Sequence, residues 1–109
     1  MEAILQQLQR GGDWAKRVGQ DLASKSPTSL KLTLKALREA RKLDFDACMK
    51  MEYRLTLRVL RGHDLYEGVR AILLDRDQQP RWKPASLAEV SDADIDRYFA
   101  PLGDNELTI

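Results

Sequence analysis

Hydrophobic residues recur every three or four positions along most of the chain, which is the spacing of amphipathic α-helices. In residues 1–10 the apolar side chains share one helical face, and Gly11 and Gly12 end the segment. Asp13 is a predicted N-cap for a second helix, in which Trp14 and Val18 lie one turn apart. We therefore predict two short helices joined by a glycine turn.

The middle of the chain carries the clearest helix signals. Ser26 and Pro27 place a hydroxyl at the N-cap and a proline at the first helical position, so a helix is predicted from there to about Lys42. Asp44 is the predicted cap of the longest helix, residues 45–61, which Gly62 ends. One stripe of this helix is charged and is predicted to face solvent: Asp46, Lys50, Arg54, Arg58 and Arg61.

The pattern after Gly62 is less regular but still helical. Asp64 and Glu67 have capping-box spacing and predict the start of another helix. Residues 75–84 are polar and interrupted by prolines, which predicts an extended segment, and Ser86 and Ser91 each predict the start of a short helix. No stretch alternates as a strand would. The predicted fold is all-α: one domain, residues 1–109, with about five main helices followed by short C-terminal ones.

Length, charge and cysteine content exclude several classes of protein. The 109 residues suit one domain, and 18 Lys and Arg against 17 Asp and Glu give a net charge of +1, which argues against a nucleic-acid partner. No apolar run approaches a membrane span and no signal peptide is visible, so no membrane partner is expected. The single Cys48 and the single His63 cannot form an internal disulfide or a soft-ligand zinc site, so we expect no metal and a reducing compartment.

The neutral total hides an asymmetry between the two halves of the chain. Residues 1–62 have a net charge of +6, and residues 63–109 have a net charge of −5. The favoured interpretation is that the halves pack against each other with complementary charge. The alternative is that the basic half faces an anionic ligand.

Three single residues are candidate chemical groups, and a structural interpretation is favoured for each. His63 follows a glycine and is predicted to lie in an exposed turn. Cys48 is predicted to be a buried and inert thiol. Glu52 lies opposite the charged stripe of its helix, so we expect it to form an internal ion pair; a catalytic acid or base is the alternative.

Two further features are candidate ligand contacts. Lys31, Lys35, Arg38 and Lys42 form a cationic stripe on one helical face, and a solvated face is favoured over a phosphate-binding one. Trp82 and Lys83 lie between two prolines, where the indole could equally fill the core or stack on a purine beside a phosphate. No glycine-rich phosphate loop and no established catalytic motif accompanies them.

Four motifs in order resemble one enzyme family. They are SPTSLK at 26–31, MEYR at 51–54, DLYEGVRAILLDRD at 64–77 and PRWKP at 80–84, followed by YFAPLGDNEL at 98–107. Together they resemble the C-terminal region of the 3-hydroxyisobutyryl-CoA hydrolases, a branch of the crotonase (enoyl-CoA hydratase/isomerase) superfamily. The resemblance covers almost the whole chain.

This resemblance implies that the chain is the last part of a longer enzyme of valine breakdown, in the bacterial cytoplasm or the mitochondrial matrix. The catalytic residues would lie in a preceding spiral core, so none is assigned here. Coenzyme A would be part of the substrate, and no cofactor is expected. Trp82 and Lys83 become the leading candidates for CoA contacts, with Lys31, Lys35 and Arg38 as weaker ones, although the 75–79 linker is longer and more acidic than the superfamily pattern.

The resemblance leaves two alternatives open. The parent could be an enoyl-CoA hydratase or isomerase, or the chain could be a free-standing helical interaction module. A hydrophobic face left uncovered in the chain is expected to cause self-association. Glycine at position 68, within the first turns of a predicted helix, lowers the stability of that helix by about 1 kcal/mol relative to alanine. We expect it to admit the close approach of another backbone.

Overall fold

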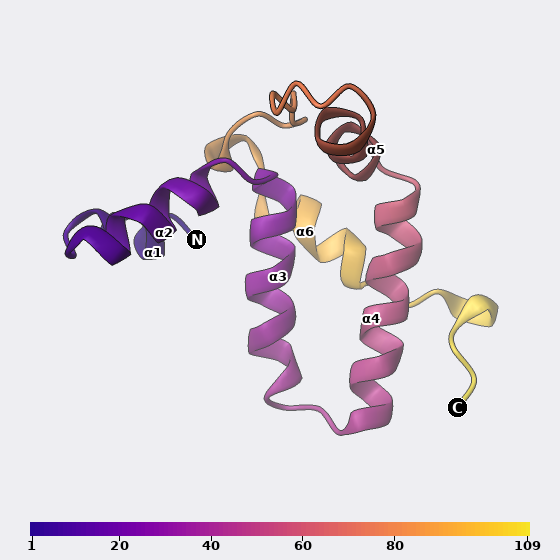
Figure 1. Ribbon diagram of the computed structural model, residues 1–109. Helices are drawn as coiled ribbons and strands as arrows, with labels where there is room; N and C mark the ends of the chain where they lie inside the picture. The colour runs from indigo at the N-terminus through magenta and orange to yellow at the C-terminus, as the bar shows by residue number, and fades with distance from the viewer.

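The computed structural model describes residues 1–109 and consists of helices without any β-strand, which confirms the predicted all-α class (Figure 1). The α-helices are α1 (Glu2–Gln9), α2 (Asp13–Ala23), α3 (Pro27–Ala40), α4 (Phe45–Leu60), α5 (Asp64–Val69) and α6 (Asp92–Phe99). The shorter elements are the π-helical turn η1 (Arg70–Leu74), which continues α5, and the 3-10 turns η2 (Leu87–Glu89) and η3 (Gly103–Asn105).

Helices α3 and α4 form an antiparallel hairpin at the centre of the fold (Figure 1). Each begins at the capping residue that the sequence predicts. The Ser26 hydroxyl accepts the backbone N–H of Ser29 at 3.2 Å, and the Asp44 carboxylate accepts that of Ala47 at 2.8 Å. These bonds satisfy backbone donors that have no partner within the helix, so local capping chemistry fixes both helix starts.

Helix α6 crosses the hairpin and closes a small hydrophobic core. It begins with a complete capping box, in which Ser91 and Asp94 exchange side-chain and backbone hydrogen bonds of 3.0 and 3.2 Å. Five buried side chains from α3, α4 and the region of α6 form the core: Leu32, Met51, Leu55, Val90 and Ile95. Their burial is what holds α6 against the hairpin.

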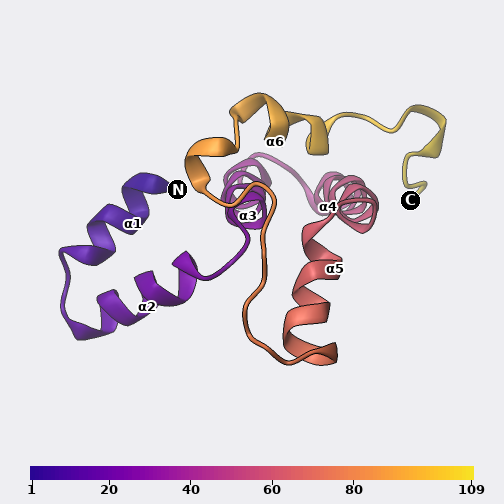
Figure 2. The ribbon, with the colours of Figure 1, turned by 90° about the horizontal axis from the view of Figure 1, so that it is seen from above.

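Helices α1 and α2 form an arm beside the hairpin (Figure 2). The arm extends the molecule, whose radius of gyration is 15.5 Å; a compact chain of this length would have about 13 Å. The predicted cap at Asp13 is wrong, because Gly12 occupies the N-cap in an extended conformation and Asp13 is the first helical residue. Its carboxylate still favours the helix, since it lies near the positive end of the helix dipole.

The charged stripe of α4 is covered by the C-terminal tail rather than by solvent. Arg54 Nε donates to Glu106 at 2.7 Å, and Arg58 donates to the carbonyls of Tyr98 at 2.9 Å and Ala100 at 2.6 Å. The prediction of a solvent stripe is therefore wrong for the middle of this helix. The contacts support the favoured interpretation of the charge asymmetry, because basic side chains of the first half bind acidic and carbonyl oxygens of the second.

Much of the apolar surface is left uncovered. Only eight of the 109 residues are buried. Large hydrophobic side chains on α3, α5 and η1 are exposed, among them Leu37, Tyr66, Leu73 and Leu74. An apolar groove of about 520 Å³ also runs between α3 and α4. No helix has the length and apolar character needed to cross a membrane.

Candidate functional site

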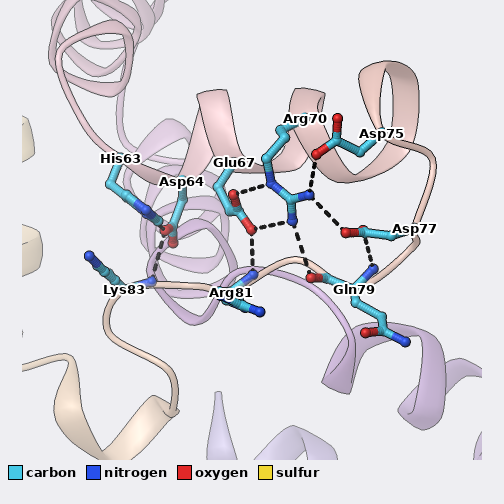
Figure 3. Close-up of polar contacts among 9 residues, drawn as sticks. All are labelled: His63, Asp64, Glu67, Arg70, Asp75, Asp77, Gln79, Arg81 and Lys83. Carbon is cyan, nitrogen blue, oxygen red and sulfur yellow. Dashed lines mark hydrogen bonds and ion pairs between the residues drawn. The ribbon is translucent and has the colours of Figure 1, made fainter.

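The first turn of α5 is held by the Asp64 carboxylate, whose contacts with His63 and Lys83 are visible in Figure 3. Asp64 accepts the Ser26 hydroxyl at 2.5 Å and the backbone N–H of Lys83 at 2.9 Å, and it contacts His63 Nδ1 at 2.8 Å. The predicted capping box of Asp64 and Glu67 is not formed, because both carboxylates bind other partners and no side chain caps the helix. His63 lies in an exposed turn, as predicted.

One turn along α5, Glu67 and Arg70 form a two-bond ion pair. Arg70 Nε and Nη2 donate to the two carboxylate oxygens at 2.7 and 2.8 Å, and the backbone N–H of Arg81 donates to the same carboxylate at 2.7 Å. The Arg70 guanidinium and, after it, the Arg81 amide lower the pKa of Glu67 to about 2. Glu67 is therefore ionised at neutral pH and joins α5 to the 80–84 segment.

The same guanidinium holds the loop after η1. Arg70 Nη1 donates to Asp75 at 2.9 Å and to Asp77 at 2.8 Å, and Nη2 reaches the Gln79 carbonyl at 3.4 Å. The pKa of Arg70 is raised by these acceptors, with Glu67 first among them, and Arg70 in turn lowers the pKa of Asp77. One side chain thus connects the helix to both ends of the loop (Figure 3).

Trp82 lies across α5 and is half-buried. Its indole N–H donates to the Ser24 carbonyl at 3.0 Å, which joins it to the connection between α2 and α3. Its ring covers Gly68 so closely that a Cβ added there would lie 3.3 Å from Trp82 Cη2. The sequence predicts the close approach of a neighbouring backbone at Gly68. The structure places an aromatic ring there instead, because the 80–84 segment passes over this turn.

Lys83 has a fixed backbone and a free side chain. Its N–H is bound by Asp64, whereas its exposed ammonium forms no hydrogen bond or ion pair and extends away from Glu67 and Arg70 (Figure 3). Lys83 lines a cavity of about 800 Å³, within the range typical of ligand pockets. The walls come mainly from apolar residues of α3, α5 and η1, and Trp82 forms part of the lining.

Lys25 is a cavity residue that the sequence reasoning missed. It lies between Ser24, which binds the Trp82 indole, and the cap Ser26, and its side chain is exposed and without a partner. The structure therefore brings two unpaired ammonium groups, from Lys25 and Lys83, to one cavity. No spacing in the sequence connects these residues, because they are 58 positions apart.

Lys31 and Lys35, two residues of the predicted cationic stripe on α3, bind other segments of the chain. Lys31 Nζ donates to two backbone carbonyls of the η2 region at 2.8 Å and pairs with Glu2 at 3.1 Å. Lys35 pairs with Asp96 and lies 4.6 Å from the centroid of a phenylalanine ring. The solvated-face interpretation is therefore wrong for these two lysines, since the η2–α6 region covers this side of α3. Arg38 is exposed, and a ligand contact along the stripe stays a prediction.

Glu52 does not form the predicted internal ion pair. It is exposed, makes no ion pair, and lines the groove between α3 and α4. The prediction failed because the side of α4 that carries Glu52 is left uncovered, whereas Met51 and Leu55 face the core and the C-terminal tail covers Arg54. Cys48 is half-buried, with its thiol 3.9 Å from the Ala40 carbonyl. No three His, Cys, Asp or Glu residues lie together as metal ligands would.

Comparison with known proteins gives consistent matches over the whole chain. The sequence pattern of the enoyl-CoA hydratase/isomerase family matches residues 1–99. The mitochondrial 3-hydroxyisobutyryl-CoA hydrolase of Gallus gallus is 52% identical over all of this chain, and that of Homo sapiens is 44% identical over 98% of it. The chain spans 29% and 28% of the length of these relatives.

Solved structures agree with the sequence matches. A carnitinyl-CoA dehydratase from Mycobacterium thermoresistibile is 40% identical, with a TM-score of 0.87 over 95% of this chain and 30% of its own. An enoyl-CoA hydratase from Rhodobacter sphaeroides 2.4.1 is 30% identical, with a TM-score of 0.88 over 97% of this chain and 32% of its own. The helical arrangement described above is therefore similar to about a third of each of these enzymes.

Proposed function

The chain belongs to the enoyl-CoA hydratase/isomerase family, and from that membership we propose that it is the C-terminal helical region of a longer 3-hydroxyisobutyryl-CoA hydrolase. The observation that carries the proposal is the 52% identity, over the whole chain, to a relative of that name. The parent would cleave the thioester to the free acid and CoA in valine breakdown. Its compartment would be the mitochondrial matrix or, in a bacterium, the cytoplasm.

Within such an enzyme, this chain would bind and pack rather than perform the chemical step. Backbone N–H groups that stabilise the thioester oxyanion, and the carboxylate that promotes acyl transfer, would belong to the preceding core. Large exposed apolar side chains that do not line the cavity, such as Tyr66 on α5 and Leu74 on η1, support a docking role, because exposed apolar surface can mark an interaction site. The occupant we propose for it is the preceding core.

The cavity beside Trp82 supports a contact with the CoA moiety. An indole face can stack on an adenine, and the unpaired ammonium groups of Lys83 and Lys25 can form charge-assisted hydrogen bonds with phosphates. The apolar walls suit the rest of a pantetheine chain. Trp82 and Lys83 are thus the main proposed substrate contacts, with Lys25 added to them; Lys31, Lys35 and Arg38 stay weaker candidates.

The contact is tested by titrating CoA into the ¹⁵N-labelled chain at low salt and following the amide resonances. We expect saturable shifts at Trp82, Lys83 and Lys25. Lys83→Gln should raise the Kd about three- to tenfold, whereas Arg97→Gln on α6 should leave it unchanged. Pantetheine, which lacks the nucleotide phosphates, should bind much more weakly than CoA. Absence of saturable shifts at millimolar CoA would contradict the site.

A second candidate function is favoured by the two solved structures, whose titles name a dehydratase and a hydratase. The parent would then add or remove water across a double bond of an acyl-CoA rather than cleave the thioester. Assays of the longer gene product with 3-hydroxyisobutyryl-CoA and with an enoyl-CoA separate the two activities. Stable folding and partner binding by the chain alone, with no core encoded upstream, would instead favour an interaction module.

A further inference from the structure

The 80–84 segment is fixed to α5 by hydrogen bonds from alternate backbone amides. The Arg81 N–H binds Glu67 at 2.7 Å and the Lys83 N–H binds Asp64 at 2.9 Å. Asp64 and Glu67 lie about one turn apart on α5, so two acceptors on one helix face hold a segment that has no secondary structure of its own. The indole bond of Trp82 anchors the residue between them.

Arg70 holds one of these acceptors, Glu67, through two hydrogen bonds. Three carboxylates, from Glu67, Asp75 and Asp77, surround its guanidinium, and all three accept hydrogen bonds from it. If the cation is removed, three like charges remain close together and repel one another. The loop would then be driven away from α5 by the same groups that now hold it there.

The loop conformation needs such a restraint. Arg70 opens a π-helical turn in which its carbonyl accepts the Asp75 N–H at 2.8 Å, a wider turn than that of an α-helix. Arg76 and Gln78 then adopt φ of 55° and 57°. This left-handed backbone conformation costs energy for residues other than glycine, and it persists only where surrounding contacts impose it. The bonds of Arg70 to Asp75 and Asp77 restrain the two residues that flank Arg76, and the Gln78 N–H donates to the Ala71 carbonyl at 3.0 Å.

We propose that Arg70 and Glu67 are positioning residues, which hold the π-turn and its loop closed so that Trp82 and Lys83 are presented at the cavity. This inference rests on the proposed CoA contact but does not require Arg70 to touch the ligand. Arg70 acts through Glu67 and the Arg81 amide, and it leaves the Lys83 ammonium free.

The test compares Arg70→Met with Arg97→Met by hydrogen exchange and CoA binding. Arg97 is a matched control, because it also pairs with an acid three positions earlier, Asp94 at 3.4 Å, but its side chain is exposed and binds no other segment. Arg70→Met should speed exchange of the Arg81 amide and the Trp82 indole N–H about tenfold or more, with core amides such as that of Leu55 unchanged. It should also raise the Kd for CoA, and Arg97→Met should do neither.

Two outcomes separate this inference from the CoA proposal. If Arg70→Met leaves the Arg81 and Trp82 exchange unchanged, or speeds exchange equally throughout the fold, the positioning role is wrong whatever CoA does. If the exchange responds locally but the unsubstituted chain binds no CoA, the positioning role stands and the CoA contact is wrong. Arg70→Lys should recover only part of the protection, because an ammonium cannot reproduce the planar fork of donors that reaches Glu67 and the loop together.

Discussion

Replacing Ser26 by alanine tests whether one buried hydroxyl joins two helix starts. Ser26 is 5% exposed, caps α3 through the Ser29 N–H, and donates to the Asp64 carboxylate at 2.5 Å. Loss of an N-cap costs about 1 kcal/mol, and loss of a hydrogen bond to a charged group costs about 1.5–3 kcal/mol. Ser26→Ala should therefore lower the free energy of unfolding by about 2.5–4 kcal/mol, a large part of a typical domain's stability.

Ser91→Ala is the matched control, because Ser91 caps α6 at an exposed site and has no such buried partner. Ser91→Ala should lower the free energy of unfolding by only about 1 kcal/mol. Ser26→Gly separates the two contributions of Ser26, since glycine is tolerated at an N-cap but cannot bind Asp64. The assay is urea unfolding followed by circular dichroism, with unchanged m-values as the condition for comparison. Equal losses in Ser26→Ala and Ser91→Ala would refute the assignment of a buried link.

Two further predictions concern glycine and pH. Gly19→Ala should raise the free energy of unfolding by up to about 1 kcal/mol, since the new Cβ meets Leu8 at an ordinary 3.4 Å. Gly68→Ala should raise the free energy of unfolding by less and should shift the Trp82 indole resonance. Equal increases in the two variants with an unmoved indole resonance would contradict this. Because the pKa of Glu67 is lowered from 4.5 to about 2, the stabilisation it provides should be complete above about pH 4.5 and lost as pH falls towards 2. Protection of the Trp82 indole in acid measures this loss, and an identical acid profile in Glu67→Gln would show that another group is responsible.

Local signals in the sequence were sufficient for most helix boundaries. Ser26, Asp44 and Ser91 form the predicted caps because a cap depends on residues within a single turn. Asp64 and Glu67 have the same spacing, yet they bind Ser26, Arg70 and the amides of the 80–84 segment. A carboxylate at a helix start can cap that helix or bind a distant segment, and the sequence alone does not distinguish these two roles.

Helical periodicity also left open which face is covered. The sequence predicts that the charged residues of α4 and the lysines of α3 face solvent, but Arg54 and Lys35 bind Glu106 and Asp96 in segments that fold back over them. Glu52 is predicted to lie in the interior and is exposed. The cavity was likewise not predictable, because Lys25 and Lys83 meet there only after the 80–84 segment has crossed α5.

The contacts that close the fold join residues far apart along the chain, and this affects how the chain folds. Lys35 and Asp96 are 61 positions apart, and Arg54 and Glu106 are 52 apart. Bundles with mainly local contacts fold fastest, because little loop entropy is lost before contacts form. Here the α3–α4 hairpin can form early, but α6 and the tail must return to it across long loops. Folding should therefore be slower than helix content suggests, and contacts of the tail should affect unfolding rates more than folding rates.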